Sequence, residues 1–208
     1  MTNKQKKGLF ASILASALAL VGCSSESNME ETRTPPKELP VAIMVVKDFG
    51  KVEIELYPHI APNTVNNFIS LANSGFYDGL TFHRVIKDFM VQGGDPEGSG
   101  MGGPGYKING EFSKNKFQND LKHTEGIISM ARSQNKNSAG SQFFIVTKNA
   151  SHLDGKYASF GKVINGMDIV HDIENIKTGA NNKPINNVII ESIKVDTKGV
   201  DYQEPEKI

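Results

Sequence analysis

The sequence predicts a mainly β fold, a closed eight-stranded antiparallel barrel capped by two α-helices. Three observations lead to this expectation. About eight short segments are either continuously apolar or alternate between apolar and polar residues, as buried and half-buried strands do. Only two segments, which begin near Pro62 and Met167, place apolar residues at helical spacing. The 208 residues suffice for one domain of ordinary size with tails, so we expect a single barrel.

The first 22 residues are predicted to be a cleaved leader. Three lysines within the first seven residues give a basic start, and residues 9–21 are apolar but too short to span a bilayer comfortably. An uncleaved membrane anchor is the alternative. The ending Leu-Val-Gly-Cys at residues 20–23 resembles the lipobox of bacterial lipoproteins. That resemblance implies cleavage before Cys23 and acylation of its thiol.

Cys23 is the only cysteine of the chain, so an intrachain disulfide cannot form and a dithiol oxidoreductase is excluded. From the leader and the expected acylation of Cys23, we expect an extracytoplasmic protein, held by a lipid anchor to the outer membrane or to the outer face of the cell membrane. Residues 23–40 are rich in Ser, Glu and Pro and predict a flexible linker. The domain is expected at residues 41–196, and residues 197–208 are expected to form a flexible tail.

The folded part begins with two strands and a helix. Residues 41–46 are continuously apolar, and Val52, Ile54 and Leu56 then alternate with charged residues, which predicts a hairpin with one solvated face. Pro62 can open a helix, because its missing N–H is not needed in the first turn. Apolar residues follow it at helical spacing up to position 72, and Gly75 can terminate the helix.

The remaining elements are mostly strands. A glycine-dense stretch at residues 93–105 contains a G-x-G-x-x-G match, but Pro104 and Gly105 follow where a dinucleotide-binding helix would begin. We therefore expect a loop whose backbone approaches an extended ligand closely. A second helix is predicted at residues 167–176. Strands are predicted at residues 80–86, 127–131, 142–146, from 160 onward, and at 188–195.

The stretch 82–95 places one cation, Arg84, among apolar residues. A buried charge is costly without a partner, which leaves two explanations. Arg84 either forms an ion pair or faces water, or its guanidinium faces a ligand at the rim of an apolar pocket. The second explanation requires other parts of the chain to supply that pocket. Phe143 and Phe144 must face opposite sides of their strand, so one is expected in the core and the other in the pocket.

Three further blocks follow at residues 126–132, 137–145 and 152–163. With residues 82–95 they closely resemble the cyclophilins, the cyclosporin-binding family of peptidyl-prolyl isomerases, over about residues 41–195. The resemblance implies the cyclophilin barrel and catalysis of cis–trans rotation about X–Pro bonds. It also implies no cofactor. The substrates would be proline-containing peptides and unfolded exported proteins, whose folding the enzyme would assist.

The resemblance also assigns residue roles. Arg84 matches the catalytic arginine, Phe89 a wall of the proline pocket, and Gln92 the glutamine that helps to hold the arginine and the substrate. The positions matched to the proline pocket and the peptide groove are Met90, Gly100, Ala131, Arg132, Ser133, Gln142, Phe144, His152, Leu153 and Tyr157.

This chain departs from the cyclosporin-sensitive eukaryotic members at four of these positions. His152 stands where they have tryptophan, Tyr157 where they have histidine, and Arg132 and Ser133 where they have Asn-Ala. A tyrosine still supplies an aromatic wall and a hydroxyl donor, so we expect isomerase activity to be retained. Cyclosporin is expected to bind weakly, because the tryptophan that donates to the drug is absent.

Composition excludes other classes of partner. Lys and Arg balance Asp and Glu at 23 each, so nothing indicates nucleic-acid binding. The five histidines are scattered without metal-ligand spacing, so no metal site is expected. One rival class stays open, a binding module that holds proline peptides as a chaperone or adhesin without turnover.

Overall fold

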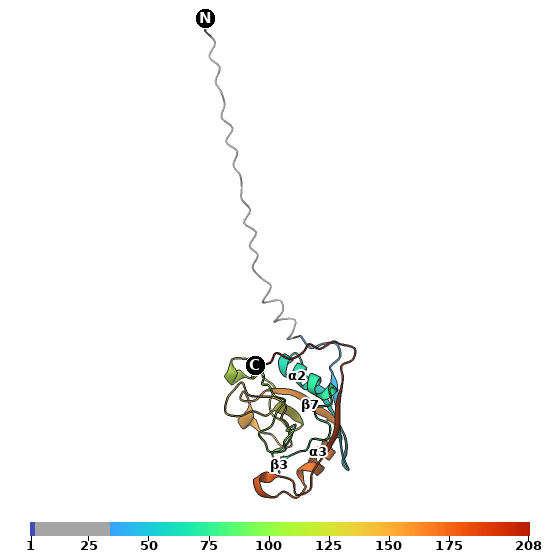
Figure 1. The fold of residues 1–208 in the computed structure, drawn as a ribbon. Helices are drawn as coiled ribbons and strands as arrows, with labels where there is room; N and C mark the ends of the chain where they lie inside the picture. Colours follow the sequence, from blue (N-terminus) through green and yellow to red (C-terminus); the bar gives the residue numbers. More distant parts are fainter. Residues whose placement is uncertain (3–33) are drawn as a thin grey trace.

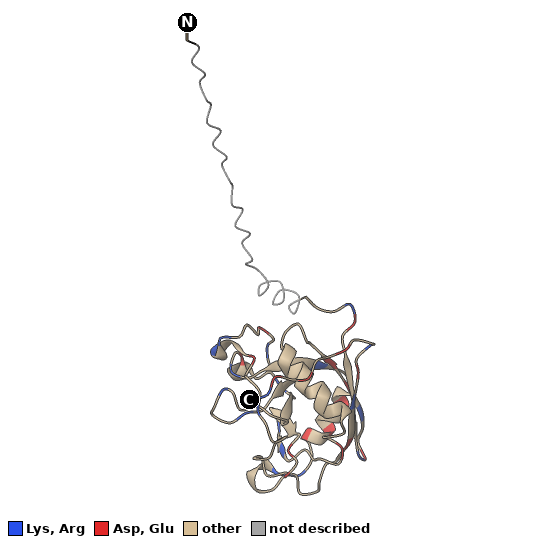
Figure 2. Ribbon diagram, turned by 45° about the horizontal axis from the view of Figure 1, so that its top comes forward, with Lys and Arg blue, Asp and Glu red and all other residues tan. Residues whose placement is uncertain are grey.

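The computed structural model of the protein describes residues 1–2 and 34–208 (Figure 1). Residues 3–22 of the predicted leader, Cys23 and most of the predicted linker therefore lie outside the described residues. In the part of the chain that the structure describes, no helix is both long and apolar enough to cross a membrane. Acidic and basic positions are interspersed along the domain, and helix α2 (Pro62–Asn73) carries neither (Figure 2).

The domain is built on one eight-stranded antiparallel sheet, which confirms the predicted mainly β class. Its strands lie in the order β3-β4-β6-β5-β7-β2-β1-β8. The first strand of the chain is thus placed beside the last one. The strands are β1 (Val41–Val46), β2 (Gly50–Leu56), β3 (Arg84–Ile86), β4 (Met90–Gly93), β5 (Ile127–Met130), β6 (Phe143–Val146), β7 (Ser159–Asn165) and β8 (Ile190–Asp196).

The expectation of a closed barrel was wrong, because the sheet is open between β3 and β8. Strand β3 is only three residues long, and the segment before it is irregular. That segment approaches β8 through single bonds: the Gly79 N–H donates to the Ile190 carbonyl at 2.8 Å, and the Phe82 N–H to the Val188 carbonyl at 3.0 Å. These bonds form no continuous ladder between β3 and β8, so the sheet is a half-barrel.

Two α-helices accompany the sheet, as predicted. Helix α2 buries Val65, Phe68, Ile69 and Ala72, and Gly75 follows its end with a φ of 81°, which glycine adopts at little cost. Helix α3 (Met167–Glu174) ends two residues earlier than expected. Three short 3₁₀ turns are η1 (Ser113–Asn115), η2 (Ser151–Leu153) and η3 (Ala180–Asn182).

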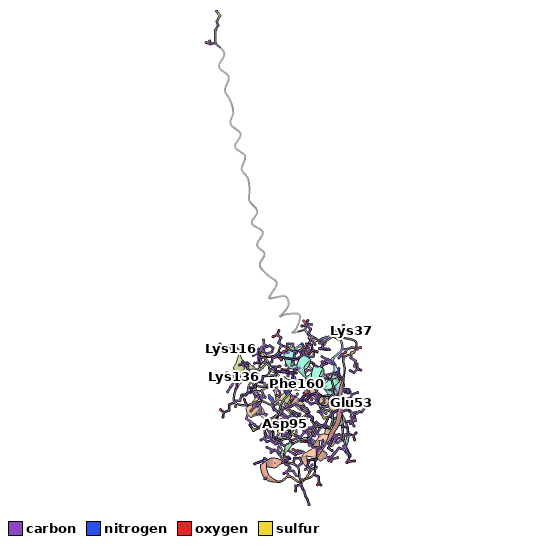
Figure 3. The ribbon with its side chains drawn as sticks, in the orientation of Figure 1. Lys37, Glu53, Asp95, Lys116, Lys136 and Phe160 are labelled. Carbon is purple, nitrogen blue, oxygen red and sulfur yellow. The ribbon has the colours of Figure 1, made fainter. Side chains whose placement is uncertain are left out.

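Aromatic side chains fill the interior between α2 and the sheet. The Phe68 ring lies 5.7 Å from Phe143 and 5.2 Å from Phe160, and all three side chains are fully buried. Of these, Phe160 is labelled in Figure 3. Phe144, by contrast, belongs to a second apolar cluster on the other side of β6. The two rings therefore lie on opposite faces of β6, as predicted, and the role of Phe144 in a pocket stays a prediction.

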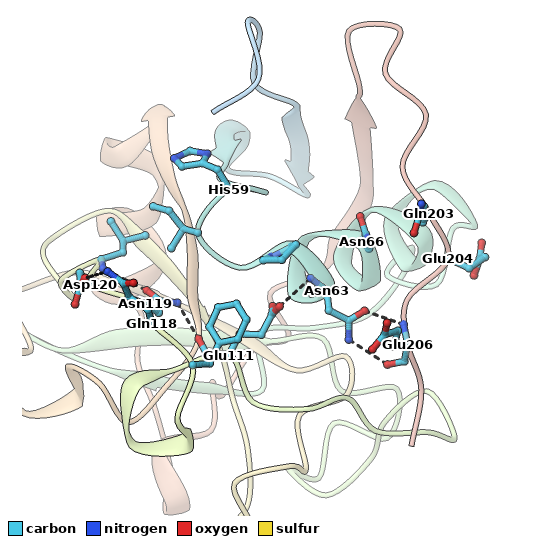
Figure 4. Close-up of a pocket in the computed structure, with 14 residues that line it drawn as sticks. His59, Asn63, Asn66, Glu111, Gln118, Asn119, Asp120, Gln203, Glu204 and Glu206 are labelled. Carbon is cyan, nitrogen blue, oxygen red and sulfur yellow. Dashed lines mark hydrogen bonds between the residues drawn. The ribbon is translucent and has the colours of Figure 1, made fainter. Parts of the chain in front are cut away.

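Residues 197–208 were expected to be a flexible tail, but hydrogen bonds hold their end against the domain. Asn63 at the start of α2 accepts from the Glu206 N–H at 2.7 Å and donates to the Glu206 carbonyl at 3.1 Å (Figure 4). Ile208 and Lys107 exchange two backbone hydrogen bonds. The end of the chain therefore contacts α2, and the sequence pattern did not predict this contact.

Candidate active site

Arg84 lies at the start of β3, on the side opposite the main core. Strand alternation turns Val85 into the core and leaves Arg84 and Ile86 half-buried on the other face. Among the described residues no carboxylate lies within ion-pairing distance of Arg84, which removes the ion-pair explanation for it there. The guanidinium is instead oriented by an amide.

A chain of three amide hydrogen bonds runs from Arg84 across the sheet. Arg84 and Gln92 are register partners in β3 and β4, and the Arg84 Nη1 donates to the Gln92 Oε1 at 3.1 Å. Gln92 Nε2 donates to Gln142 Oε1 at 2.9 Å, and Gln142 Nε2 donates to the Gly102 carbonyl at 2.9 Å. Each amide both donates and accepts, which fixes its orientation and directs the guanidinium.

The second apolar cluster adjoins this chain of amides. Register places Phe144 of β6 opposite Gln92 of β4, so that its ring is on the face that carries Arg84. Phe89 lies in the turn before β4, and the Tyr157 ring meets Phe144 edge-on at 5.9 Å. Met90, Phe144, Val146, Ala150 and Leu153 form the buried part of the cluster, against which Ile86, Phe89, Ala131 and Tyr157 pack.

His152 lies at the rim of the cluster, in η2. Its side chain is exposed, and its ring centroid lies 5.3 Å from that of Phe89. The structure thus brings the predicted pocket residues together around one apolar surface. Gly100 lies apart from it, in a loop that the Asp95 carboxylate holds through hydrogen bonds from the backbone N–H groups of Glu97 and Gly100.

Arg132 and Ser133, which stay predicted residues of the peptide groove, form hydrogen bonds with neighbouring segments of the chain. Arg132 Nε and Nη2 both donate to the Lys156 carbonyl, at 3.0 and 2.8 Å. The guanidinium carbon stands 4.6 Å from the centre of the Tyr157 ring, so the cation supports that aromatic wall. The Ser133 hydroxyl is 2.8 Å from that of Ser138.

A buried polar network beneath the pocket was not anticipated from the sequence. His123 Nδ1 lies 3.1 Å from Asp154 Oδ1, and His123 Nε2 lies 3.0 Å from Ser129 Oγ. Because an ionised carboxylate only accepts, the neutral ring carries its proton on Nδ1 and accepts from Ser129 on Nε2. The imidazole stacks on Phe144 at 6.1 Å. Ser129 is fully buried, so this triad supports the pocket and offers no nucleophile.

Acidification is expected to destabilise the domain through this network. Burial lowers the pKa of His123 in the folded state, although Asp154 acts in the opposite direction. The unfolded chain therefore takes up a proton first. The contribution of neutral His123 to the free energy of unfolding is fully present above pH 6.5, the ordinary histidine pKa. It is lost as the pH falls from there toward the folded-state pKa of His123. Urea midpoints measured between about pH 8 and about pH 5 test this.

The control for this experiment is His123→Gln. The pKa of His83 is also lowered by burial, whereas Glu174 raises that of His171. The variant should therefore flatten the pH dependence of the midpoint without abolishing it. An unchanged dependence in His123→Gln would show that this imidazole is not a source of acid sensitivity.

A hollow of about 860 Å³ lies elsewhere, at the start of α2 (Figure 4). Its walls include Glu111, Glu204 and Glu206, and none of the described residues that line it is Lys or Arg. None of the predicted site residues borders this hollow, so the hollow is separate from the candidate site. The candidate site is instead defined by one oriented cation beside a contiguous apolar surface, which suits an extended apolar peptide.

Comparisons with known proteins agree with this geometry. Residues 41–195 match the family model described as cyclophilin type peptidyl-prolyl cis-trans isomerase/CLD. Peptidyl-prolyl cis-trans isomerase B of Bacillus subtilis is 50% identical over 131 residues, which cover 63% of this chain and 88% of that protein. Peptidyl-prolyl cis-trans isomerase-like 2 of Gibberella zeae is 42% identical over 149 residues, 71% of this chain but only 25% of that protein's length.

A solved structure shares the fold. The cyclophilin type isomerase of Cryptosporidium parvum, crystallised in the presence of the dipeptide Ala-Pro, superposes with a TM-score of 0.69 at 35% identity. The match covers 75% of this chain and 98% of that one. The family model matches the whole β-rich domain that carries Arg84, and the solved structure with the same fold belongs to the same family. Accordingly, the chain belongs to the cyclophilin-type peptidyl-prolyl cis-trans isomerases.

Proposed function

We propose that this isomerase acts outside the cytoplasm on X–Pro bonds of exported or envelope proteins, with Arg84 as its catalytic residue. The observation that carries the residue assignment is the Arg84 guanidinium, which a chain of amides orients and no described carboxylate neutralises. Its position beside the cluster around Phe144 lets one peptide contact both.

The reaction requires loss of amide conjugation. The barrier to rotation is about 18–20 kcal/mol, and uncatalysed isomerisation takes tens of seconds or longer. Shortening this to milliseconds requires roughly 10⁴-fold acceleration, or about 5.5 kcal/mol. In the twisted state the prolyl nitrogen regains a lone pair, and a fixed donor that meets it favours that state over both planar ones.

The side chains divide this work. Arg84 stays protonated and presents a rigid donor fork to the prolyl nitrogen. Phe89, Met90, Phe144 and Leu153 hold the proline ring while the rest of the peptide turns, and Gln92 keeps the guanidinium in place. No bond is made or broken apart from hydrogen bonds, so these residues need only hold and orient their substrate.

A protease-coupled assay with an Ala-Pro peptide tests turnover by residues 34–208. The rival, a module that binds proline peptides without turnover, predicts binding of the same peptide with no increase in isomerisation rate. A second assay follows the refolding of a denatured protein whose slow phase is limited by proline isomerisation. Peptide turnover without any effect on such a slow phase would argue against a role in protein folding.

The location rests on the sequence of the N-terminus. Cys23→Ser should leave the precursor uncleaved at this position and unacylated, since the thiol is the expected lipid acceptor. Each buried CH₂ contributes about 0.8 kcal/mol, and stable anchoring needs more than one acyl chain. Mass spectrometry of the membrane-extracted protein checks this prediction. An unmodified Cys23 in the mature, membrane-bound form would contradict it.

A further inference from the structure

Phe89 occupies a turn whose conformation needs support. The turn at residues 87–89 joins β3 to β4, and Asp88 adopts a φ of 56° there. A non-glycine residue in this left-handed region is strained, because its Cβ crowds the backbone. Phe89, the next residue, accepts through its carbonyl from the Thr147 N–H at 3.0 Å. Thr147 therefore holds the backbone on the C-terminal side of Phe89.

The carboxylate of Glu174 bonds to Asp88, on the N-terminal side of Phe89, and to Thr147. Glu174 is the last residue of α3, which packs against β3 and β4 (Figure 1), and its side chain is only 8% exposed. Its Oε1 accepts from the Asp88 N–H at 2.6 Å and from the Thr147 hydroxyl. Its Oε2 faces His171 Nδ1 at 3.1 Å.

These donors keep the buried carboxylate charged. Burial alone would raise the pKa of Glu174, but the hydrogen bonds from Thr147, His171 and Asp88 outweigh it and lower the pKa. Bonds to an ionised acceptor are roughly twice as strong as neutral ones. Glu125 backs the imidazole of His171, with 2.6 Å between its Oε1 and the His171 Nε2. The Asp88 carboxylate points elsewhere, to Lys148 at 3.3 Å.

We propose that Glu174 is a positioning residue of the isomerase. It fixes the turn at residues 87–89 and the end of β6, and thereby holds the Phe89 ring against the proline pocket. The route is short, since the Asp88 peptide is directly linked to Phe89 and Thr147 bonds to the Phe89 carbonyl. The inference rests on the role of Phe89 proposed above.

Glu174→Ala is expected to lower kcat/KM about tenfold, because small misplacements of a binding wall reduce the rate steeply. Glu174→Gln keeps one acceptor oxygen for the Asp88 N–H and should recover most of this loss. Thr147→Val removes one donor at nearly constant shape and should lower kcat/KM about threefold. Thr147→Val and Glu174→Gln also keep the test decisive if Glu174→Ala does not fold.

The matched control is Glu111→Ala. Glu111 is also a buried carboxylate, 5% exposed, and accepts backbone N–H bonds from Asn63 and Thr64 at the start of α2. Its removal should reduce stability while leaving kcat/KM within about twofold at a temperature where the variant is folded. A similar loss of kcat/KM in Glu111→Ala would show that general destabilisation explains the Glu174 result.

A double-mutant cycle with Phe89→Ala isolates the pathway. In a Phe89→Ala background, Glu174→Ala should lower kcat/KM by less than about twofold, because the effects of coupled residues are not additive. Full additivity, or an unchanged kcat/KM in both Glu174→Ala and Thr147→Val, would overturn the positioning role. If Phe89→Ala alone leaves activity intact, the proposed pocket itself is wrong, and the two failures are thereby distinguished.

Discussion

Arg84→Ala is expected to lower kcat/KM by about two to three orders of magnitude, the usual cost of removing a donor that is fixed on a developing lone pair or charge. Arg84 is half-buried and bonds to the protein through Gln92, so we expect its removal to cost only about 1 kcal/mol of stability. Protease-coupled kinetics and a urea titration measure the two effects separately.

Arg84→Lys should recover little of the activity. A lysine keeps the charge but replaces the planar fork with a compact ammonium, which cannot reach Gln92 and the prolyl nitrogen with the same geometry. The matched control is Lys162→Ala, which removes an exposed cation from β7 and should leave turnover unchanged. Near-normal turnover in a folded Arg84→Ala protein would remove this residue from the mechanism.

Cyclosporin is expected to inhibit this protein weakly, and His152→Trp to tighten its binding by roughly one to three orders of magnitude. The loss of one hydrogen bond costs about 0.5–1.5 kcal/mol, and unburied apolar area adds about 25 cal/mol per Å². Each 1.4 kcal/mol is about tenfold in affinity. His152 is exposed at the rim beside Phe89, so we expect the protein to accommodate the larger indole of His152→Trp without repacking its core.

Titration of the drug against both forms measures this effect. Turnover of an Ala-Pro peptide should change little in His152→Trp, because Arg84 and the cluster around Phe144 are untouched. Inhibition of the parent protein at nanomolar drug would contradict the prediction. So would a tryptophan variant that binds no more tightly than the parent.

Local patterns predicted most of the secondary structure. Period-two alternation is a property of a few adjacent residues, so it indicated β2 and the opposite faces of Phe143 and Phe144 without knowledge of the partners. Closure of the barrel depends on whether two distant edges form a ladder. That depends on the irregular backbone before β3, which hydrophobic pattern does not encode.

The candidate site was predicted unevenly for a related reason. Arg84 was conspicuous as a single cation in an apolar stretch, whereas Gly102 contributes only a carbonyl, which every residue type has. His123 and Asp154 are 31 positions apart, and Glu174 bonds to residues 27 and 86 positions away. Such pairs are made by the tertiary fold, so no local spacing could reveal them.

The position of β1 between β2 and β8 has a consequence for the order in which the domain can assemble. As the chain emerges N-terminus first, β1 pairs with β2 on one side through a short turn. Its other side stays open until residues 190–196 have appeared, nearly the whole domain later. Such distant pairing slows folding and exposes a bare strand edge meanwhile. The edge of β1 that faces β8 is therefore the last central edge of the sheet to be covered.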